Sequence, residues 1–289
     1  MSGWAPAGAL TEIALPEMWQ RVAGCGLQFL LIGESDHRIW QTGAEIVKAI
    51  PVLAGGGFAH LGLEWQRRTL QPVIDFFNAA SASDRANGAD MRMLTMVFTA
   101  LPGAAAQANP AMGRQFVDVN KALLYLARQR NVQAHALNML PGLGDFIGAE
   151  KPDRQERFMR ALVDLSAPVP SLARLQADEE PLFRKYLEAY MTSNLAQDKS
   201  RATLFQAAAG TARAMVMHGP AHFRGEGQGG IDDFLPADRQ IYVLLGAGLS
   251  LQEAFAETRT GTRRAPDFVA DVLEAKAWLM PAAKMHALV

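Results

Sequence analysis

A short apolar segment near the N-terminus constrains the fold more than any other feature of the sequence. Residues 27–32 have the sequence Leu-Gln-Phe-Leu-Leu-Ile, and Gly33 ends the run. Short apolar runs bounded by a glycine are typical of strands that are buried on both faces. Such strands occur in parallel sheets that helices cover on both sides. The segment therefore predicts an α/β protein.

The residues that follow predict a strand–helix–strand unit. Helical spacing of apolar residues extends over 39–53, and the glycines at 55–57 end that helix. Residues 59–64 predict a second strand, and 68–80 predict a second helix. The connection between the two strands is long enough for a parallel crossover.

The rest of the chain continues the alternation of strands and helices. Strands are expected at 91–100, 132–137, 212–217 and 241–245, and helices at 116–130, over most of 154–209, and at 267–279. Alternation of this kind predicts a three-layer α/β/α fold with a mainly parallel sheet. We expect residues 1–289 to form a single α/β domain with a helical insertion at about 150–210.

Composition and charge exclude several classes of protein. Basic and acidic residues number 28 and 29, so the net charge of −1 gives no reason to expect nucleic-acid binding. No window of about 18 uncharged apolar residues is present, so no membrane span is expected.

The single cysteine, Cys25, cannot form an internal disulfide, which favours a reducing, cytoplasmic location. Residues 22–25 are similar to a lipoprotein processing box, but Glu17 and Arg21 interrupt the apolar stretch that should precede it.

Polar residues gather after three of the predicted strands. They are Glu34, Asp36, His37 and Arg38 after the first, Glu64, Gln66 and Arg67 after the second, and His218 and His222 after 212–217. Ligands of open α/β sheets bind outside the carboxyl ends of the strands, so we expect these residues to converge.

These residue types permit two kinds of chemistry. A carboxylate beside a histidine makes a general base that can activate water, and a nearby arginine can hold an anionic group. Two histidines and a glutamate can instead bind a divalent metal ion. The sequence does not decide between the two versions.

Each residue also has a purely structural interpretation. Glu34 could cap the next helix, Glu64 could be a solvated strand end, and His218 and His222 could be surface or core residues. His60 and His135 lie inside strands and are expected to be structural. The phosphate-loop, dinucleotide and Gly-x-Ser-x-Gly motifs are absent from the sequence.

Four segments resemble motifs of the erythromycin esterase and ChaN-like superfamily, which includes the Tiki-type proteases. They are Leu31-Ile32-Gly33-Glu34-Ser35-Asp36-His37, Leu61-Gly62-Leu63-Glu64, Gln71-Pro72-Val73-Ile74-Asp75-Phe76-Phe77, and Met215-Val216-Met217-His218-Gly219-Pro220-Ala221-His222-Phe223. The order and strand context agree across 27–223, although the middle third carries no matching motif.

The resemblance implies an α/β/α fold and a cleft lined by these residues. By similarity to the esterases, His37 would activate water, Glu34 and Glu64 would orient it, and His218 and His222 would complete the pocket. By similarity to the Tiki-type branch, a zinc, manganese or cobalt ion would bind at Glu34, His37, Glu64 and His222. By similarity to ChaN, the chain would bind haem.

Two features depart from these relatives. The histidines are spaced as His-x-x-x-His, whereas the esterases tend toward a tighter pair, and the chain has no credible lipoprotein anchor.

The leading hypothesis is a hydrolase that acts on an ester, amide or related bond of a small molecule or peptide. Arg67 would bind an anionic group of the substrate, and Arg38 and Gln66 would assist. A haem-binding protein, a lyase or peptide-modifying enzyme, and a protein that has lost its activity stay open as alternatives. The oligomeric state also stays open.

Overall fold

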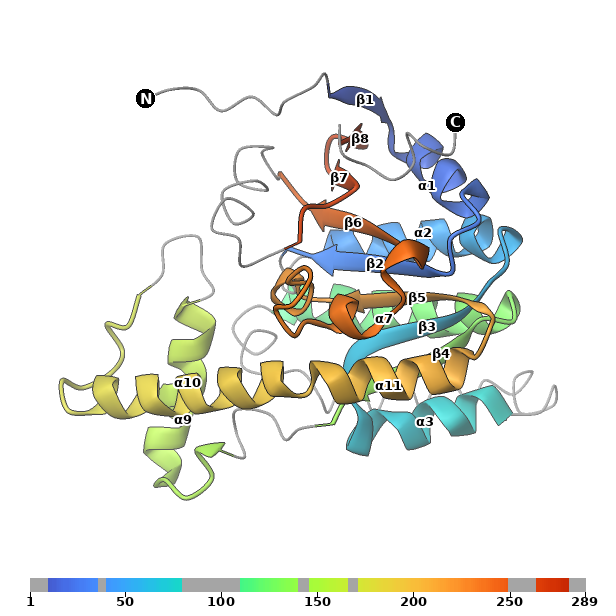
Figure 1. The fold of residues 1–289 in the computed structure, drawn as a ribbon. Helices are drawn as coiled ribbons and strands as arrows, with labels where there is room; N and C mark the ends of the chain where they lie inside the picture. Colours follow the sequence, from blue (N-terminus) through green and yellow to red (C-terminus); the bar gives the residue numbers. More distant parts are fainter. Residues whose placement is uncertain are drawn as a thin grey trace.

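The described residues form one eight-stranded sheet covered by helices (Figure 1). In this computed structural model the described ranges are 10–35, 40–79, 110–139, 146–165, 171–248 and 264–280. The strands are β1 (Thr11–Ala14), β2 (Phe29–Glu34), β3 (Phe58–Gln66), β4 (Gln133–Asn138), β5 (Arg213–His218), β6 (Gln240–Gly246), β7 (Phe268–Asp271) and β8 (Lys276–Leu279). Their order across the sheet is β1-β8-β7-β6-β2-β5-β3-β4.

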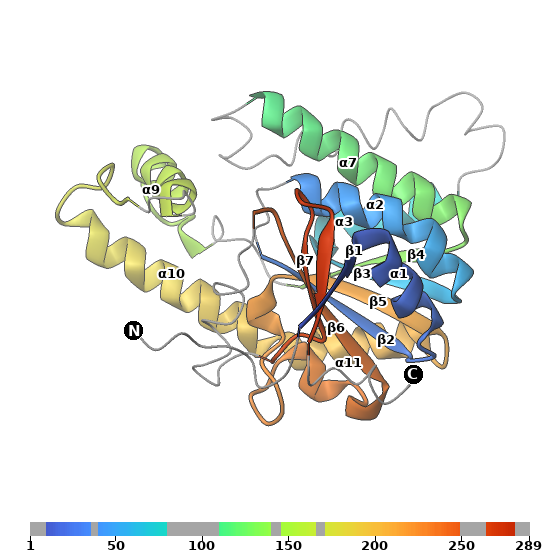
Figure 2. The same ribbon diagram turned by 90° about the horizontal axis from the view of Figure 1, so that it is seen from above.

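The sheet is parallel from β7 to β4, and only β8 runs antiparallel to its two neighbours, β7 and β1. The helices are α1 (Leu15–Gly24), α2 (Trp40–Gly55), α3 (Arg67–Ala79), α7 (Pro110–Gln129), α9 (Pro152–Leu165), α10 (Glu179–Ala196) and α11 (Asp198–Ala209). Figure 2 shows α2 and α7 on one face of the sheet and α11 on the other. The predicted three-layer α/β/α fold with a mainly parallel sheet is confirmed.

The central strand β2 is buried on both faces, as its sequence predicts. Phe29, Leu30, Leu31 and Ile32 have at most 1% of their surface exposed. A Cβ atom at Gly33 would lie 2.5 Å from the hydroxyl oxygen of Tyr242, so the strand requires glycine there. The strand is therefore tightly packed between β5 and β6 up to its carboxyl end.

The helix predicted at 267–279 is wrong, because this segment forms the hairpin of β7 and β8. Glu274, Ala275 and Lys276 favour a helix, but Glu274 and Ala275 lie in the turn, where Ala275 has φ of 54°, and Lys276 begins β8. All four residues of β7 are buried beside β6, and this tertiary pairing outweighs the local preference.

Three helices, α9, α10 and α11, lie between β4 and β5 in the described part of the chain. The arm, which we define as residues 146–165 and 171–196, holds α9 and α10 and projects from the sheet (Figure 1). It has its own small apolar cluster, with Ile147, Phe158, Ala161 and Phe183 fully buried. In contrast, α11 packs directly on β3 and β4.

Two further expectations concern a strand at 91–100 and membrane-spanning helices. The strand expected at 91–100 lies outside the described residues. None of the helices in the described ranges combines the length and the apolar character that crossing a bilayer requires.

Candidate active site

Three parallel strands bring polar side chains to the same edge of the sheet. β2 ends at Glu34, and the neighbouring β5 ends at His218. In β3, Glu64 directly follows Leu63, which pairs with Met217 of β5. Carboxyl ends of parallel strands are where α/β proteins place their ligands, so this edge is the natural location for chemistry.

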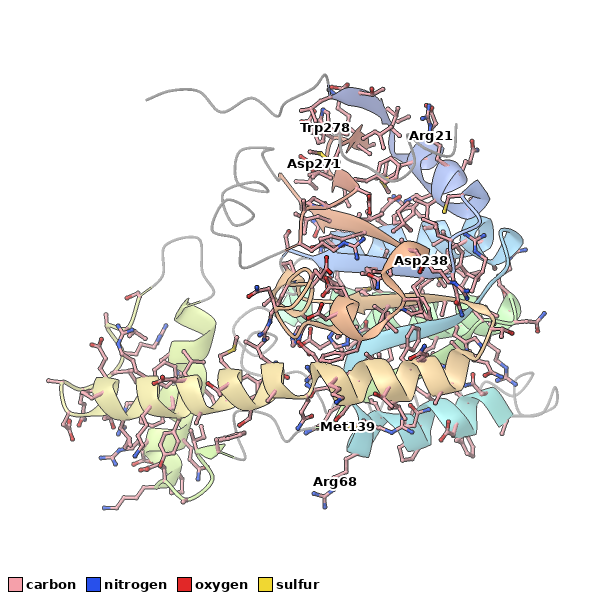
Figure 3. All side chains as sticks on the ribbon, viewed as in Figure 1. Arg21, Arg68, Met139, Asp238, Asp271 and Trp278 are labelled. Carbon is pink, nitrogen blue, oxygen red and sulfur yellow. The ribbon has the colours of Figure 1, made fainter. Side chains whose placement is uncertain are left out.

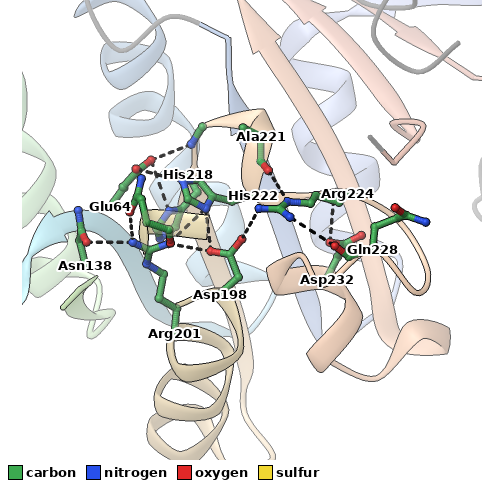
Figure 4. Close-up of polar contacts among 12 residues, drawn as sticks. Glu64, Asn138, Asp198, Arg201, His218, Ala221, His222, Arg224, Gln228 and Asp232 are labelled. Atoms are coloured by element: carbon green, nitrogen blue, oxygen red, sulfur yellow. Dashed lines mark hydrogen bonds and ion pairs between the residues drawn. The ribbon is translucent and has the colours of Figure 1, made fainter. Parts of the chain in front are cut away.

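The carboxylate of Glu64 faces two imidazole rings (Figure 4). Its Oε2 atom lies 3.4 Å from Nδ1 of His218, and its Oε1 atom lies 3.3 Å from Nε2 of His222. The backbone N–H of Gly219 donates to Oε2 at 2.9 Å. The short turn Pro220–His222 brings the second histidine back toward the first, with their ring centroids 5.1 Å apart.

His218 is a buried imidazole to which the described residues offer no hydrogen bond. The side chain is fully buried, and neither ring nitrogen has a hydrogen-bond partner among the described residues. The approach to Glu64 is close but is not aligned as a hydrogen bond. Burial lowers the pKa of His218 to about 4, so the ring is neutral at pH 7 and keeps a nitrogen lone pair. A buried polar atom without a partner is costly, which makes this ring a candidate ligand.

His222 lies between two carboxylates. Its Nδ1 atom is 2.7 Å from Oδ1 of Asp198, on the side opposite Glu64. Burial alone would lower the pKa of His222, but the hydrogen bonds with Asp198 and Glu64 outweigh burial and raise it. The ring is therefore held in a fixed orientation from both sides.

The residues that orient His222 come from α11, and the sequence did not reveal them. Asp198 and Arg201 are both fully buried and form an ion pair of 2.7 Å. Arg201 also donates to the backbone carbonyl of Asn194 at 2.7 Å and to Oδ1 of Asn138 at 2.9 Å. An Asp-x-x-Arg spacing on a helix is usually a solvated surface pair, so only the packing of α11 identifies these residues.

A cavity of about 270 Å³ lies beside this cluster. The described residues that line it are Glu34, Trp40, Gly43, Leu63, Glu64, Trp65, Val119, Asn120, Leu123, Asn138, Tyr190 and Met217. Glu64 is the shared member of cluster and cavity, and Glu34 accepts a hydrogen bond from the hydroxyl of Thr42. Two carboxylates therefore line the same cavity as aromatic and amide side chains.

The remaining predicted residues lie elsewhere or outside the described part of the chain. Arg67 donates to the Ala136 carbonyl at 3.2 Å and to Gln71 at 3.3 Å, and it is not among the described residues that line the cavity. The same holds for Gln66. Arg68, the residue after Arg67, is exposed and points away from the molecule (Figure 3).

His37 and Arg38 fall outside the described ranges, so their predicted roles stay predictions. His60 and His135, expected to be structural, form a stacked pair on adjacent strands, with 3.0 Å between Nδ1 and Nε2.

The geometry suits a metal ion at three residues. One ligand atom each from Glu64, His218 and His222 lies within 4.8 Å of the other two. Two imidazoles and a carboxylate are a ligand set used by catalytic zinc and related divalent ions. Asp198 supplies the outer carboxylate that typically orients a metal-binding histidine. The group includes His218 and not Glu34, whereas the sequence led us to expect Glu34 and His37 beside Glu64 and His222.

Comparison with known proteins adds little to this geometry. No protein-family model and no curated protein sequence matches the chain. A solved structure of the type III effector HopBA1 is similar over 78% of this chain and 80% of that one, with 15% sequence identity and a TM-score of 0.41. A similarity this distant carries no functional argument, so the superfamily resemblance stays a prediction from the motifs.

Proposed function

We propose that this chain is a metal-assisted hydrolase of the erythromycin esterase and ChaN-like superfamily. Its substrate is a small molecule or peptide with an ester, amide or related bond. The observation that carries the proposal is the buried His218 ring, which has no hydrogen-bond partner among the described residues and faces the carboxylate that also approaches His222. A divalent ion held at this point would lower the pKa of a bound water and polarise a carbonyl group.

The carboxylates on both sides of His222 favour a metal-assisted mechanism over one in which His222 itself acts as the general base. With a proton on each nitrogen, His222 donates toward both Asp198 and Glu64 and has no lone pair to accept a proton. With only Nδ1 protonated, the ring still donates to Asp198 and turns a free Nε2 toward Glu64. In that second state a cation between the ring and the carboxylate would bind both the Nε2 lone pair and Oε1 of Glu64, which is what a ligand set provides.

The other cavity residues have matching roles in this proposal. Glu34 lines the same cavity as Glu64 and can accept the proton of the attacking water. Trp40 and Trp65 form aromatic walls against which a substrate can pack. His37, the general base implied by the motif, stays a predicted partner of Glu34.

The haem alternative is less well supported. A haem iron needs an imidazole that reaches the haem pocket. His218 and His222 are 0% and 3% exposed, and neither is among the described residues that line the cavity. We also propose a cytoplasmic location, which the single free cysteine, Cys25, favours.

Metal analysis of the protein purified without chelator tests the proposal. We expect about one equivalent of zinc, manganese or cobalt per chain, lost together with p-nitrophenyl ester hydrolysis in His218→Ala. His135→Ala is the matched control, because it removes an imidazole of β4 that pairs with His60 and not with Glu64. This variant should keep its metal and its hydrolytic activity. Metal content and hydrolysis that are unchanged in His218→Ala would overturn the proposal. A stoichiometric Soret band would favour the haem alternative.

A further inference from the structure

We infer that Tyr190 is a catalytic residue of this hydrolysis, whose hydroxyl donates a hydrogen bond to the oxyanion that forms when water attacks the substrate. The inference rests on the proposed function, and it assigns a chemical role to the arm, whose helix α10 carries this residue. Asn194, Asp198 and Arg201 follow Tyr190 along α10 and α11 and connect the same helices to the histidine cluster.

The position of Tyr190 is fixed from two sides. Its ring packs edge-on against Phe146, with centroids 5.9 Å apart and an interplanar angle of 79°. The same side chain lines the cavity together with Glu34, Glu64 and Asn138. The apolar cluster of the arm therefore holds the ring while the side chain forms part of the cavity wall.

Tyr190 has the chemistry that an oxyanion needs. It is the only residue with an O–H donor among the described residues that line the cavity. The phenol of an ordinary tyrosine has a pKa of about 10, and burial raises the pKa of the Tyr190 phenol further. The phenol therefore keeps its proton across the working pH range and serves as a donor rather than a base.

The proposed hydrolysis has two steps, the attack of water on the carbonyl carbon and the release of the leaving group. The water oxygen forms a bond to the carbonyl carbon, the π electron pair moves onto the carbonyl oxygen, and Glu34 takes the proton of the water. The oxyanion accepts a hydrogen bond from Tyr190, which keeps its own proton. The electron pair then re-forms the carbonyl, the bond to the leaving oxygen or nitrogen breaks, and Glu34 returns the proton to the leaving group.

The first test compares Tyr190→Phe with the unchanged protein, using p-nitrophenyl acetate as the probe. Removal of one oxyanion donor is expected to lower kcat by about 100- to 1,000-fold, with KM and metal content unchanged. Tyr125→Phe is the matched control, because this tyrosine on α7 is 42% exposed and should keep its full rate. A rise in KM with kcat unchanged would show that Tyr190 is only a wall of the cavity and would overturn the inference.

A second test uses the pH profile, which a wall residue would not affect. Replacement of Tyr190 by a ring-fluorinated tyrosine lowers the pKa of the phenol, so the alkaline fall in kcat should move to lower pH. An unmoved alkaline limb would contradict the role of the hydroxyl.

The outcomes separate this inference from the proposal beneath it. If His218→Ala abolishes hydrolysis and Tyr190→Phe does not lower kcat, only the tyrosine inference fails. If the unchanged protein does not hydrolyse p-nitrophenyl acetate faster than buffer, or if His218→Ala is fully active, the proposed function fails and the inference fails with it.

Discussion

The sheet and the arm bury their side chains in different ways. The sheet packs β2, β5 and β6 into one continuous apolar cluster that extends to α1, α2 and α11. The arm has only a small cluster of its own. It adds ion pairs in which the fully buried Glu179 faces Arg154 and Arg157. The proposed metal ligands come from β3, β5 and the turn after β5. The residues that orient His222 come from α11, and the arm contributes Tyr190 to the wall of the cavity. This division predicts that activity depends on how the arm packs on the sheet, although none of the three proposed ligands lies in the described part of the arm.

The largest expected effect comes from matched truncations in the two clusters. Phe205 of α11 and Phe183 of the arm are both fully buried. Phe205→Ala should lower the global free energy of unfolding by about 3–5 kcal/mol, because it leaves a cavity in the continuous core. Phe183→Ala should mainly open the arm, since Phe183 belongs to the arm's own apolar cluster and not to the core of the sheet.

Urea denaturation and limited proteolysis distinguish the two variants. We expect a shifted global transition for Phe205→Ala, and new cleavage within residues 146–196 for Phe183→Ala. An equal loss of global stability in both variants would mean that arm and sheet unfold as one unit, and the contrast between them would not hold.

The next effect concerns the connection between α11 and the ligands. Asp198→Asn should weaken zinc binding by about 10- to 100-fold, because Asp198 fixes the orientation and tautomer of His222. Competition with a chelating dye measures this change. Asp178→Asn in the arm, at a side chain that is 73% exposed, is the control and should leave the affinity unchanged. Equal affinities in the two variants would remove Asp198 from the metal site.

Acid should affect the sheet before the arm. Burial, with the nearby charges of His60 and Arg67, lowers the pKa of His135 from 6.5 to about 4. Between these values the unfolded chain binds more protons at this residue than the folded chain. Stability therefore falls as the pH decreases from 6.5 toward 4. The hydrogen bond from Arg157 lowers the pKa of Glu179 to about 2, so the ion pair of the arm persists through this range.

Thermal unfolding at a series of pH values tests the acid prediction. His135→Gln should be less sensitive than the unchanged protein between pH 6.5 and 4, because the substituted side chain does not titrate. The same slope in both proteins would show that His135 is not the residue responsible.

The sequence predicts the parts of the site that come from strand ends. The apolar run before Glu34, the strand before Glu64 and the strand before His218 each have a period and a terminating residue that can be recognised locally. Parallel strands then bring their carboxyl ends together without further information. The three-layer fold follows from the same pattern, which is why it was predicted correctly.

The parts supplied by α10 and α11 could not be predicted in this way. Asp198, Arg201 and Tyr190 lie in a long helical stretch where any polar residue could face solvent. Only the break at Gln197 and the packing of α11 on β3 and β4 bring Asp198 and Arg201 to His222. Tyr190 precedes that break on α10 and lines the cavity. The hairpin of β7 and β8 was missed for a related reason, since pairing with distant strands overrides local helix preference.

The smallest expected effect tests whether surface charges matter to the arm. Arg184 pairs with Glu180 one helical turn earlier at 2.7 Å, and both side chains are well exposed. Arg184→Ala should change the free energy of unfolding by at most about 0.5 kcal/mol, since water and salt screen such pairs. Arg157→Ala should cost more, because it removes a direct partner of the buried Glu179. If urea denaturation gave equal losses for the two variants, the arm would depend on its outer ion pairs as much as on its buried one. Its small core would then be less important than the contrast with the sheet requires.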